Sequence, residues 1–333
     1  MFLLLLLSLI LVAAGDGMDV WILAGQSNMV GENNIDDGDP EQMPDCGTPW
    51  PGRIFTYPPA ANYGKVFERH TPSSMPPSEW MVARPNICLS AFTHHHHPDL
   101  DIERLGPGLA FAKRLIMRNA SLRVGFVPMG LGGTSLYRNW LPDFVYHLTA
   151  LVPRAMEAAG PNARLRGMLW VQGETDAQDD PDARPPARRK DWAALGYGHN
   201  LYTLVEIVRN ATRAYDPCLP IIIGVIQTEG RERVFPHIQV VRQAQLDFSA
   251  HQILKIDMAE KNYEMFEQNT TAAWGWTGTI PEGADVQLVH LTKKAQCEFG
   301  SDMADLYLDK WGADGPRRCG APKGCPKLKL SPG

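Results

Sequence analysis

The chain has 333 residues, of which 44% are hydrophobic and 21% are charged, so it can bury a substantial core in one large or two modest domains. Its formal net charge of -5 argues against nucleic acid or an anionic membrane as its partner, because neither attracts an acidic protein over long range. We therefore expect a globular protein that acts on a neutral or small substrate, with no stable membrane partner.

The N-terminus is typical of a secretory signal. An apolar run over residues 2–14 is too short to span a bilayer comfortably, and it ends in the small residues Ala13 and Ala14, followed by Gly15. Because this run has no Lys or Arg before it, an uncleaved anchor is the alternative interpretation. We predict a signal peptide over 1–15 and a protein secreted to the extracellular space or the cell wall.

Apolar runs alternate with segments of helical period along the rest of the chain. The runs predict buried, mostly parallel strands at 19–24, 122–127, 166–171, 220–226 and 253–257. Two segments place apolar residues on one helical face: Leu109, Ala112 and Ile116 in the first, and Ala295, Phe299, Met303 and Leu306 in the second. This alternation predicts an α/β fold over 16–312, a three-layer α/β/α sandwich around a mostly parallel sheet.

Two segments lack this periodicity. Residues 33–105 are rich in Pro, Asp and Asn, and we expect a loop-rich insertion over one sheet edge that shapes a substrate cleft. Within it, consecutive histidines at His94–His97 cannot all face one site, which favours a solvated loop over a metal site. Residues 313–333 form a basic tail rich in Cys, Pro and Gly, expected to be extended or pinned by a disulfide.

Cysteines and sequons also suit the secretory route. The six cysteines lack the paired spacing of a zinc site, which favours disulfides, although spacing does not choose among the pairings: Cys46, Cys88, Cys218, Cys297, Cys319 and Cys325. Cys319 and Cys325 could close a small loop in the tail. Sequons at Asn119, Asn210 and Asn269 indicate a glycoprotein.

Polar motifs follow three of the predicted strands, at the sheet edge where ligands of such folds bind. They are Gly25-Gln26-Ser27-Asn28-Met29, Gly132-Gly133-Thr134-Ser135 and Gln172-Gly173-Glu174-Thr175-Asp176. Ser27 is placed like the serine of a nucleophile elbow, although Gly-x-Ser-x-Gly is absent, and its structural alternative is a turn former or helix cap. The glycine turn lacks the ending of a phosphate-binding loop. The N–H groups of Ser27 and of Gly132 or Gly133, with the Gln172 amide, could instead form an oxyanion hole.

His290 is the candidate for the base. It lies in Val-His-Leu-Thr just before the last amphipathic segment, where Thr292 can cap the helix and the imidazole can face the cleft. A structural histidine at a helix start is the alternative.

The order of these motifs resembles that of the SGNH-hydrolase superfamily, and within it the sialate-O-acetylesterase-like carbohydrate esterases, including the plant members. The resemblance covers about residues 18–310. It implies a flavodoxin-like fold, Ser27 as nucleophile, His290 as general base, and Ser27, Gly132 or Gly133 and Gln172 as oxyanion donors. It also implies a carbohydrate O-acetylesterase that hydrolyses acetylated polysaccharide or glycan without a metal or organic cofactor.

One position departs from this family. The triad acid of such enzymes stands three residues before the histidine, where this chain has Gln287. Glutamine can orient an imidazole but cannot offset its charge. Asp285, Glu174 or Asp176 could replace the acid, or the enzyme could work as a Ser–His dyad. Two further alternatives are a sugar-binding pseudoenzyme with weakened catalysis and a sugar O-acyltransferase.

Overall fold

The computed structural model describes residues 17–31, 45–48, 50–57, 79–83, 105–180, 189–232, 234–268, 287–316 and 319, with the backbone alone at 266–268 and 287–288. Several predictions fall outside these ranges: those on the signal peptide, Cys88, His94–His97, Asn269, Asp285 and Cys325. The domain boundaries therefore stay predictions.

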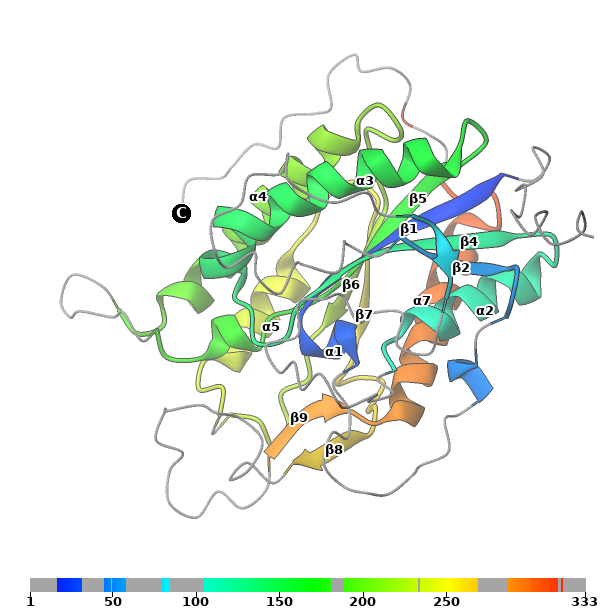
Figure 1. Ribbon diagram of the computed structural model, residues 1–333. Coiled ribbons are helices and arrows are strands. Elements are labelled where there is room, and N and C mark those ends of the chain that lie inside the picture. Colours follow the sequence, from blue (N-terminus) through cyan, green and yellow to red (C-terminus); the bar gives the residue numbers. More distant parts are fainter. Residues whose placement is uncertain are drawn as a thin grey trace, which may run out of the picture.

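A seven-stranded sheet forms the centre of the molecule, in the order β3-β2-β4-β1-β5-β6-β7 (Figure 1). The five predicted strands are all present and parallel: β1 (Met18–Gly25), β4 (Arg123–Gly130), β5 (Arg164–Val171), β6 (Ile221–Val225) and β7 (Ile253–Asp257). Every residue of β1 is buried. Burial on both faces explains why these strands read as near-continuous apolar runs.

The insertion contributes two short strands that we did not predict. β2 (Ile54–Thr56) pairs parallel to β4, and β3 (Met81–Val82) pairs antiparallel to β2 at the edge of the sheet. The expectation of loops alone is corrected for these residues. Segments of two or three residues are too short to show a strand period.

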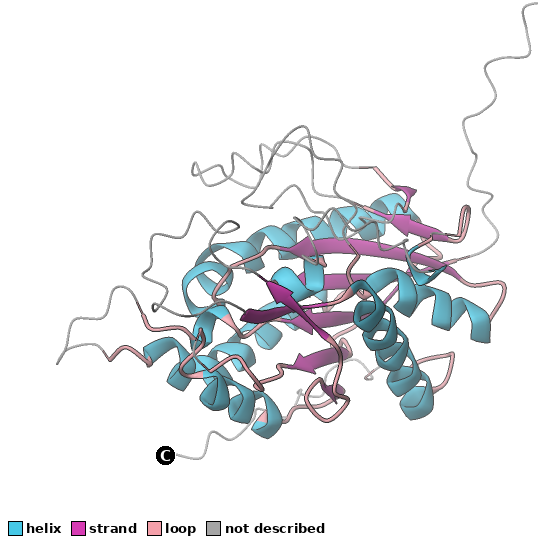
Figure 2. Ribbon diagram, turned by 90° about the horizontal axis from the view of Figure 1, so that it is seen from below, coloured by secondary structure: helices cyan, strands magenta, loops and turns pink. Residues whose placement is uncertain are grey.

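Helices cover both faces of the sheet, which confirms the three-layer sandwich (Figures 1 and 2). One face carries α2 (Gly108–Arg118) and α7 (Lys293–Trp311), and the other carries η4 (Leu136–Phe144), α3 (Val145–Ala159), α4 (Trp192–Thr212) and α5 (Ile238–Asp247). Alternate residues of β1 serve the two cores. Trp21 and Leu23 pack in the cluster of α2 and α7, whereas Ile22 and Ala24 pack in the other.

Smaller elements lie at the carboxyl ends of the strands or at the insertion. They are α1 (Ser27–Val30), η5 (Thr175–Ala177) and η1 (Asp45–Gly47). β8 (Met265–Gln268) and β9 (Gln287–Leu291) form a separate antiparallel pair, which lies beside α1 in Figure 1. Thr292 caps α7 as predicted, because its hydroxyl accepts a hydrogen bond from the N–H of Ala295 at 3.1 Å.

Two disulfides link distant parts of the chain, Cys46 to Cys297 and Cys218 to Cys319. The possible Cys319–Cys325 loop is therefore ruled out, because Cys319 is paired with a residue 101 positions earlier. The tail is pinned at Cys319, as the sequence suggested. None of the helices in the described ranges is long and apolar enough to cross a membrane.

Candidate active site

Ser27 lies at a sharp turn where β1 ends. Gly25 makes this turn possible, because it lets the backbones of β1 and β5 approach closely there. Gly25 has a φ of +147°, and a Cβ atom at this position would lie 2.1 Å from the carbonyl oxygen of Val171. The N–H of Gln26 donates to the same oxygen at 2.9 Å. Ser27 then begins α1 with 2% of its surface exposed. This turn holds the serine at the carboxyl edge of the sheet.

The glycine-rich turn after β4 lies against the end of β1. The N–H of Leu131 donates to the carbonyl oxygen of Gly25 at 3.0 Å. Gly133 has a φ of +67°, in the left-handed region that glycine enters without steric cost. Among the described residues, no hydrogen bond uses the N–H of Ser27, Gly132 or Gly133. These three groups are candidate oxyanion donors.

Asp176 is a fully buried carboxylate that organises this turn. It accepts hydrogen bonds from Ser135 Oγ at 2.8 Å, Leu136 N at 2.7 Å, Tyr137 N at 3.2 Å and Gln172 Nε2 at 2.6 Å. Burial raises the pKa of the Asp176 carboxyl, and the hydrogen bonds act in the opposite direction. The contacts tie the turn after β4 to the Gln-Gly-Glu motif after β5.

Gln172 is held by contacts on both ends of its amide. Its Nε2 lies 2.8 Å from the carbonyl oxygen of Thr134, 2.6 Å from Asp176 and 3.2 Å from Gln26 Oε1. Its Oε1 accepts from the Tyr197 hydroxyl at 3.0 Å. An amide nitrogen carries two hydrogens, so the two shorter contacts use both of them.

Gln26 is a site residue to which we assigned no role from the sequence. Its Oε1 lies 3.4 Å from both the N–H of Gly173 and the N–H of Thr175. The residue before Ser27 is therefore joined to the turn that carries Gln172. Its place inside the Gly-Gln-Ser-Asn motif was the available signal.

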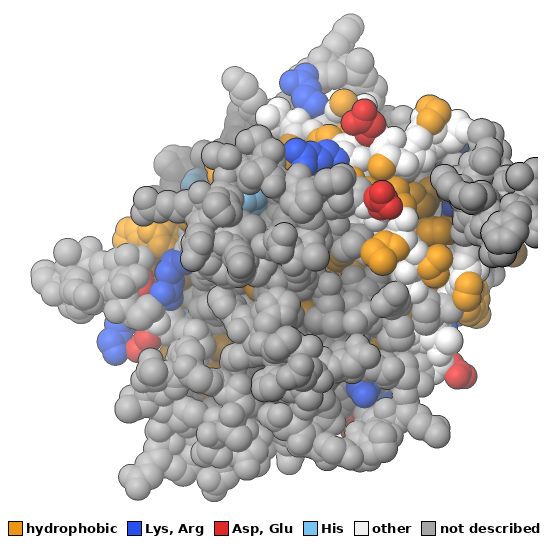
Figure 3. Space-filling model, viewed as in Figure 1, with side chains coloured by type: hydrophobic (Ala, Val, Ile, Leu, Met, Phe, Trp, Pro, Cys, Tyr) orange, Lys and Arg blue, Asp and Glu red, His pale blue; other side chains and the backbone are white. Residues whose placement is uncertain are grey.

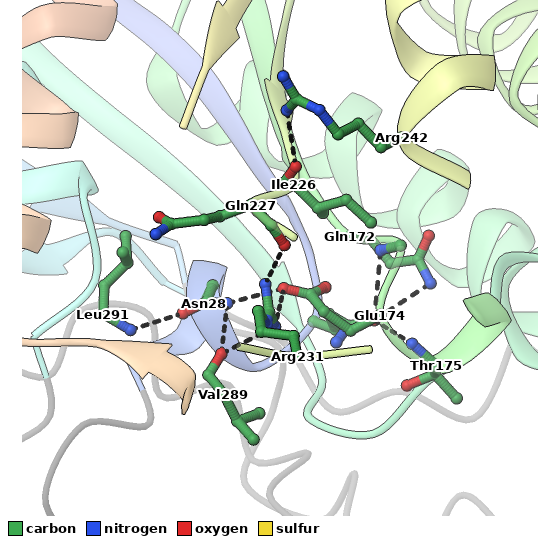
Figure 4. Close-up of polar contacts among 12 residues, drawn as sticks. Asn28, Gln172, Glu174, Thr175, Ile226, Gln227, Arg231, Arg242, Val289 and Leu291 are labelled. Atoms are coloured by element: carbon green, nitrogen blue, oxygen red, sulfur yellow. Dashed lines mark hydrogen bonds and ion pairs between the residues drawn. The ribbon is translucent and has the colours of Figure 1, made fainter. Parts of the chain in front are cut away.

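His290 is buried on β9, with 2% of its surface exposed. The Asn28 side chain contacts the backbone on both sides of it (Figure 4): Asn28 Nδ2 donates to Val289 O at 3.2 Å, and Asn28 Oδ1 accepts from Leu291 N at 3.0 Å. An adjacent strand would offer β9 the same pair of groups. The residue after Ser27 thus sets the register of the strand that carries His290.

A buried ion pair completes this docking of β9. Glu174 Oε1 accepts from Asn28 Nδ2 at 2.8 Å and from Arg231 Nη2 at 3.1 Å. Arg231 Nη2 also lies 3.0 Å from the carbonyl oxygen of Val289. Arg231 had no sequence signal, because a lone arginine in a polar loop is most often a solvated one.

Three of the candidates for the triad acid lie among the described residues. Gln287 begins β9, so its backbone is within three residues of His290 on the same strand. Glu174 binds Asn28 and Arg231, and Asp176 binds the glycine-rich turn. The structure thus assigns both of these carboxylates to contacts that shape the site.

One group of potential metal ligands comes together within the described part of the chain, Cys218, His251 and Cys319. Two of its three members are joined as a disulfide. Cys218 precedes β6, so the group lies at the amino ends of the strands, away from Ser27.

Comparison with known proteins supports an esterase. A family model described as carbohydrate esterase, sialic acid-specific acetylesterase, matches residues 17–309. A probable carbohydrate esterase from Arabidopsis thaliana is 25% identical over 299 residues, which cover 88% of this chain and 91% of that protein. These matches agree with the order of motifs in the sequence.

Two solved structures share the fold. A protein from Arabidopsis thaliana superposes with a TM-score of 0.60 at 22% identity, covering 88% of this chain and 98% of that one. The protein NanS gives a TM-score of 0.60 at 17% identity, covering 89% and 98%. Because the family model matches most of the chain, the chain belongs to this family of carbohydrate esterases, which are carboxylic ester hydrolases.

Proposed function

We propose that the protein is a secreted carbohydrate O-acetylesterase that works through an acyl-enzyme on Ser27, with His290 as general base. The observation that carries the proposal is a pair of hydrogen bonds made by the side chain of Asn28, the residue after Ser27. They bind the backbone of Val289 and Leu291, the two neighbours of His290. Membership of the carbohydrate esterase family supports the substrate class.

The chemistry follows from these roles. Ser27 Oγ attacks the acetyl carbonyl carbon while His290 accepts the hydroxyl proton. When the tetrahedral intermediate collapses, the C–O bond to the sugar breaks and His290 returns the proton to the leaving sugar oxygen. Water then attacks the acetyl-serine with His290 again as base, which releases acetate and restores Ser27.

The negative charge of the intermediate requires fixed donors. We assign this role first to the N–H groups of Ser27 and of Gly132 or Gly133, which lie on adjoining turns. Gln172 would add a third donor by turning one N–H from Thr134 or Asp176 toward the oxyanion. The two backbone donors are fixed by the turns that carry them and need little rearrangement during the reaction, whereas Gln172 must exchange one hydrogen-bond partner.

In this scheme the rate is limited by Gln287, which stands where the triad acid would be. Gln287 can accept a hydrogen bond from the imidazole but cannot stabilise the imidazolium by charge. In a serine protease, replacing the triad aspartate with asparagine lowers turnover about 10⁴-fold, a loss that combines tautomer and charge effects. We expect a smaller gain from restoring the acid here.

Secretion is supported by the two disulfides among the described residues, which persist in oxidising compartments. The proposed substrate is an acetylated polysaccharide or glycan, and the scheme uses neither a metal nor an organic cofactor.

The test is hydrolysis of 4-nitrophenyl acetate by the purified parent, Ser27→Ala and Gln287→Asp. We expect Ser27→Ala to abolish turnover and Gln287→Asp to raise kcat by about tenfold or more, since a charged partner stabilises the imidazolium. A parent without activity that Gln287→Asp does not rescue would contradict the esterase mechanism. It would leave binding of acetylated glycan without turnover as the function to examine.

A further inference from the structure

The strand that carries His290 depends on side chains for its position. β9 is not a member of the seven-stranded sheet, and its strand partner among the described residues is β8. A two-stranded ribbon is at best marginally stable by itself. The place of His290 relative to Ser27 is therefore decided by the groups that dock β9 to the carboxyl edge of the sheet.

Arg231 is one of these groups, and it reaches β9 from the loop after β6. Its Nη1 donates to Gln227 O at 3.0 Å, while Nη2 lies 3.0 Å from Val289 O and 3.1 Å from Glu174 Oε1. Its guanidinium also lies over the Phe235 ring, 5.2 Å from the centroid. A planar guanidinium has fixed donor directions, so these hydrogen bonds hold β9 and the turns after β5 and β6 in one relative arrangement.

The burial of the ion pair between Arg231 and Glu174 needs an explanation beyond stability. Arg231 and Glu174 each have 1% of their surface exposed. Hydrophobic residues can often replace a buried ion pair without loss of stability, because desolvation offsets much of the attraction. A hydrogen-bonded ion pair is better suited than apolar packing to fixing one strand in one register, since its hydrogen bonds are directional.

We propose that Arg231 is a positioning residue for His290. It holds the carbonyl group of Val289, and with Glu174 and Asn28 it fixes the backbone from which the imidazole projects. This inference rests on the proposed function, because it takes His290 as the general base. Since Gln287 offers no charge to orient the imidazole, the backbone of β9 carries more of that task.

The test compares Arg231→Met and Arg231→Lys with Arg242→Met as a matched control. Arg242 is partly buried, pairs with Asp257 at the end of β7 and donates to Ile226 O, and its contacts among the described side chains do not include β9 (Figure 4). Kinetics with 4-nitrophenyl acetate are measured for every variant that circular dichroism shows to be folded. We expect Arg231→Met to lower kcat on the order of 10²-fold with KM little changed, as for a misplaced catalytic group. Arg231→Lys should restore part of the loss, and Arg242→Met should match the parent.

A second readout does not depend on turnover. The imidazole resonances of His290 are assigned by their loss in His290→Gln and followed in a ¹H–¹³C correlation spectrum. We expect them to shift or broaden in Arg231→Met and Arg231→Lys and to stay in place in Arg242→Met. If Arg231→Met does not fold, Arg231→Lys and this spectrum still decide the question.

The outcomes separate the two proposals. Parent-like kcat and an unchanged His290 resonance in folded Arg231 variants overturn the positioning role, while loss of activity in Ser27→Ala keeps the esterase mechanism. Full activity in Ser27→Ala or His290→Gln overturns the mechanism, and the His290 resonance then shows by itself whether Arg231 positions β9.

Discussion

At Gly25, a hydrogen atom occupies space that no side chain can enter. The Val171 carbonyl oxygen would lie 2.1 Å from a Cβ atom there, and the same oxygen binds the N–H of Gln26. Gly133, on the adjoining turn, also has a positive φ, but a Cβ atom there would meet nothing within 4 Å. The two glycines have different physical requirements, because one needs space and the other needs only backbone freedom.

We predict that Gly25→Ala and Gly133→Ala differ sharply in stability. Gly133→Ala should lower the free energy of unfolding by about 1–2 kcal/mol, the cost of a left-handed non-glycine residue. Gly25→Ala should cost more than about 3 kcal/mol or prevent folding, because β1 and β5 would have to separate. Urea unfolding of both variants measures this difference, and equal costs would refute the assignment of a close backbone contact at Gly25.

At the scale of elements, α5 and β7 are joined by an ion pair close to the candidate site. Arg242 binds both carboxylate oxygens of Asp257, through Nη1 at 2.8 Å and Nη2 at 2.5 Å. Burial raises the pKa of Asp257, but the hydrogen bonds from Arg242 and from the N–H groups of Glu260 and Ala259 outweigh it, so the pKa is lowered overall.

The sign of this shift gives a prediction of pH dependence. An acid whose pKa is lower in the folded state stabilises the fold above its unfolded pKa of about 3.9, and this contribution is lost as the pH falls through the folded value. Asp257→Asn should therefore cost about 1–3 kcal/mol at neutral pH. Its difference from the parent should shrink below about pH 4.

Urea unfolding of parent and Asp257→Asn over a pH series measures this difference. Asp247→Asn is the control, because Asp247 is exposed on α5, the helix that carries Arg242, and accepts a hydrogen bond from the Gln243 side chain. It should change stability by no more than about 0.5 kcal/mol. A constant difference between Asp257→Asn and the parent across the series would contradict the assigned ion pair.

For the whole molecule, the disulfides constrain long segments while the site lies at one end of the sheet. Cys46–Cys297 and Cys218–Cys319 close loops with sequence separations of 251 and 101 residues. Cys218 precedes β6, whereas Ser27 follows β1, so the second disulfide and the site lie at opposite ends of the parallel strands. On the face in Figure 3, described Lys and Arg side chains lie near described Asp and Glu side chains.

Replacing both Cys218 and Cys319 with serine should therefore affect stability and not catalysis. A loop of about 100 residues corresponds to about 4.7 kcal/mol in the chain-entropy model, and losses of about 2–5 kcal/mol are typical. Urea unfolding should show a loss in this range, while kcat on 4-nitrophenyl acetate stays at the parent value. An unchanged free energy of unfolding, or a lower kcat in the folded variant, would be inconsistent with these roles.

The sequence by itself determined the fold class and the edge of the sheet at which the candidate site lies. Buried parallel strands are apolar over most of their length, so β1, β4, β5, β6 and β7 were visible as local runs. Polar motifs directly after such runs must lie at the carboxyl edge, whatever the order of the strands. The motif order also identified the esterase family, which the family model confirms.

Only the tertiary structure decided the disulfide partners, the docking of β9 and the contacts of Arg231. Local periodicity carries no information on pairs such as Asn28 with Glu174 or Asn28 with Val289, which are 146 and 261 residues apart. β2, β3 and β8 are too short for a reliable period, and a buried arginine has the same sequence appearance as a solvated one. Long-range packing decides each of these features, because the chain must fold before the partners meet.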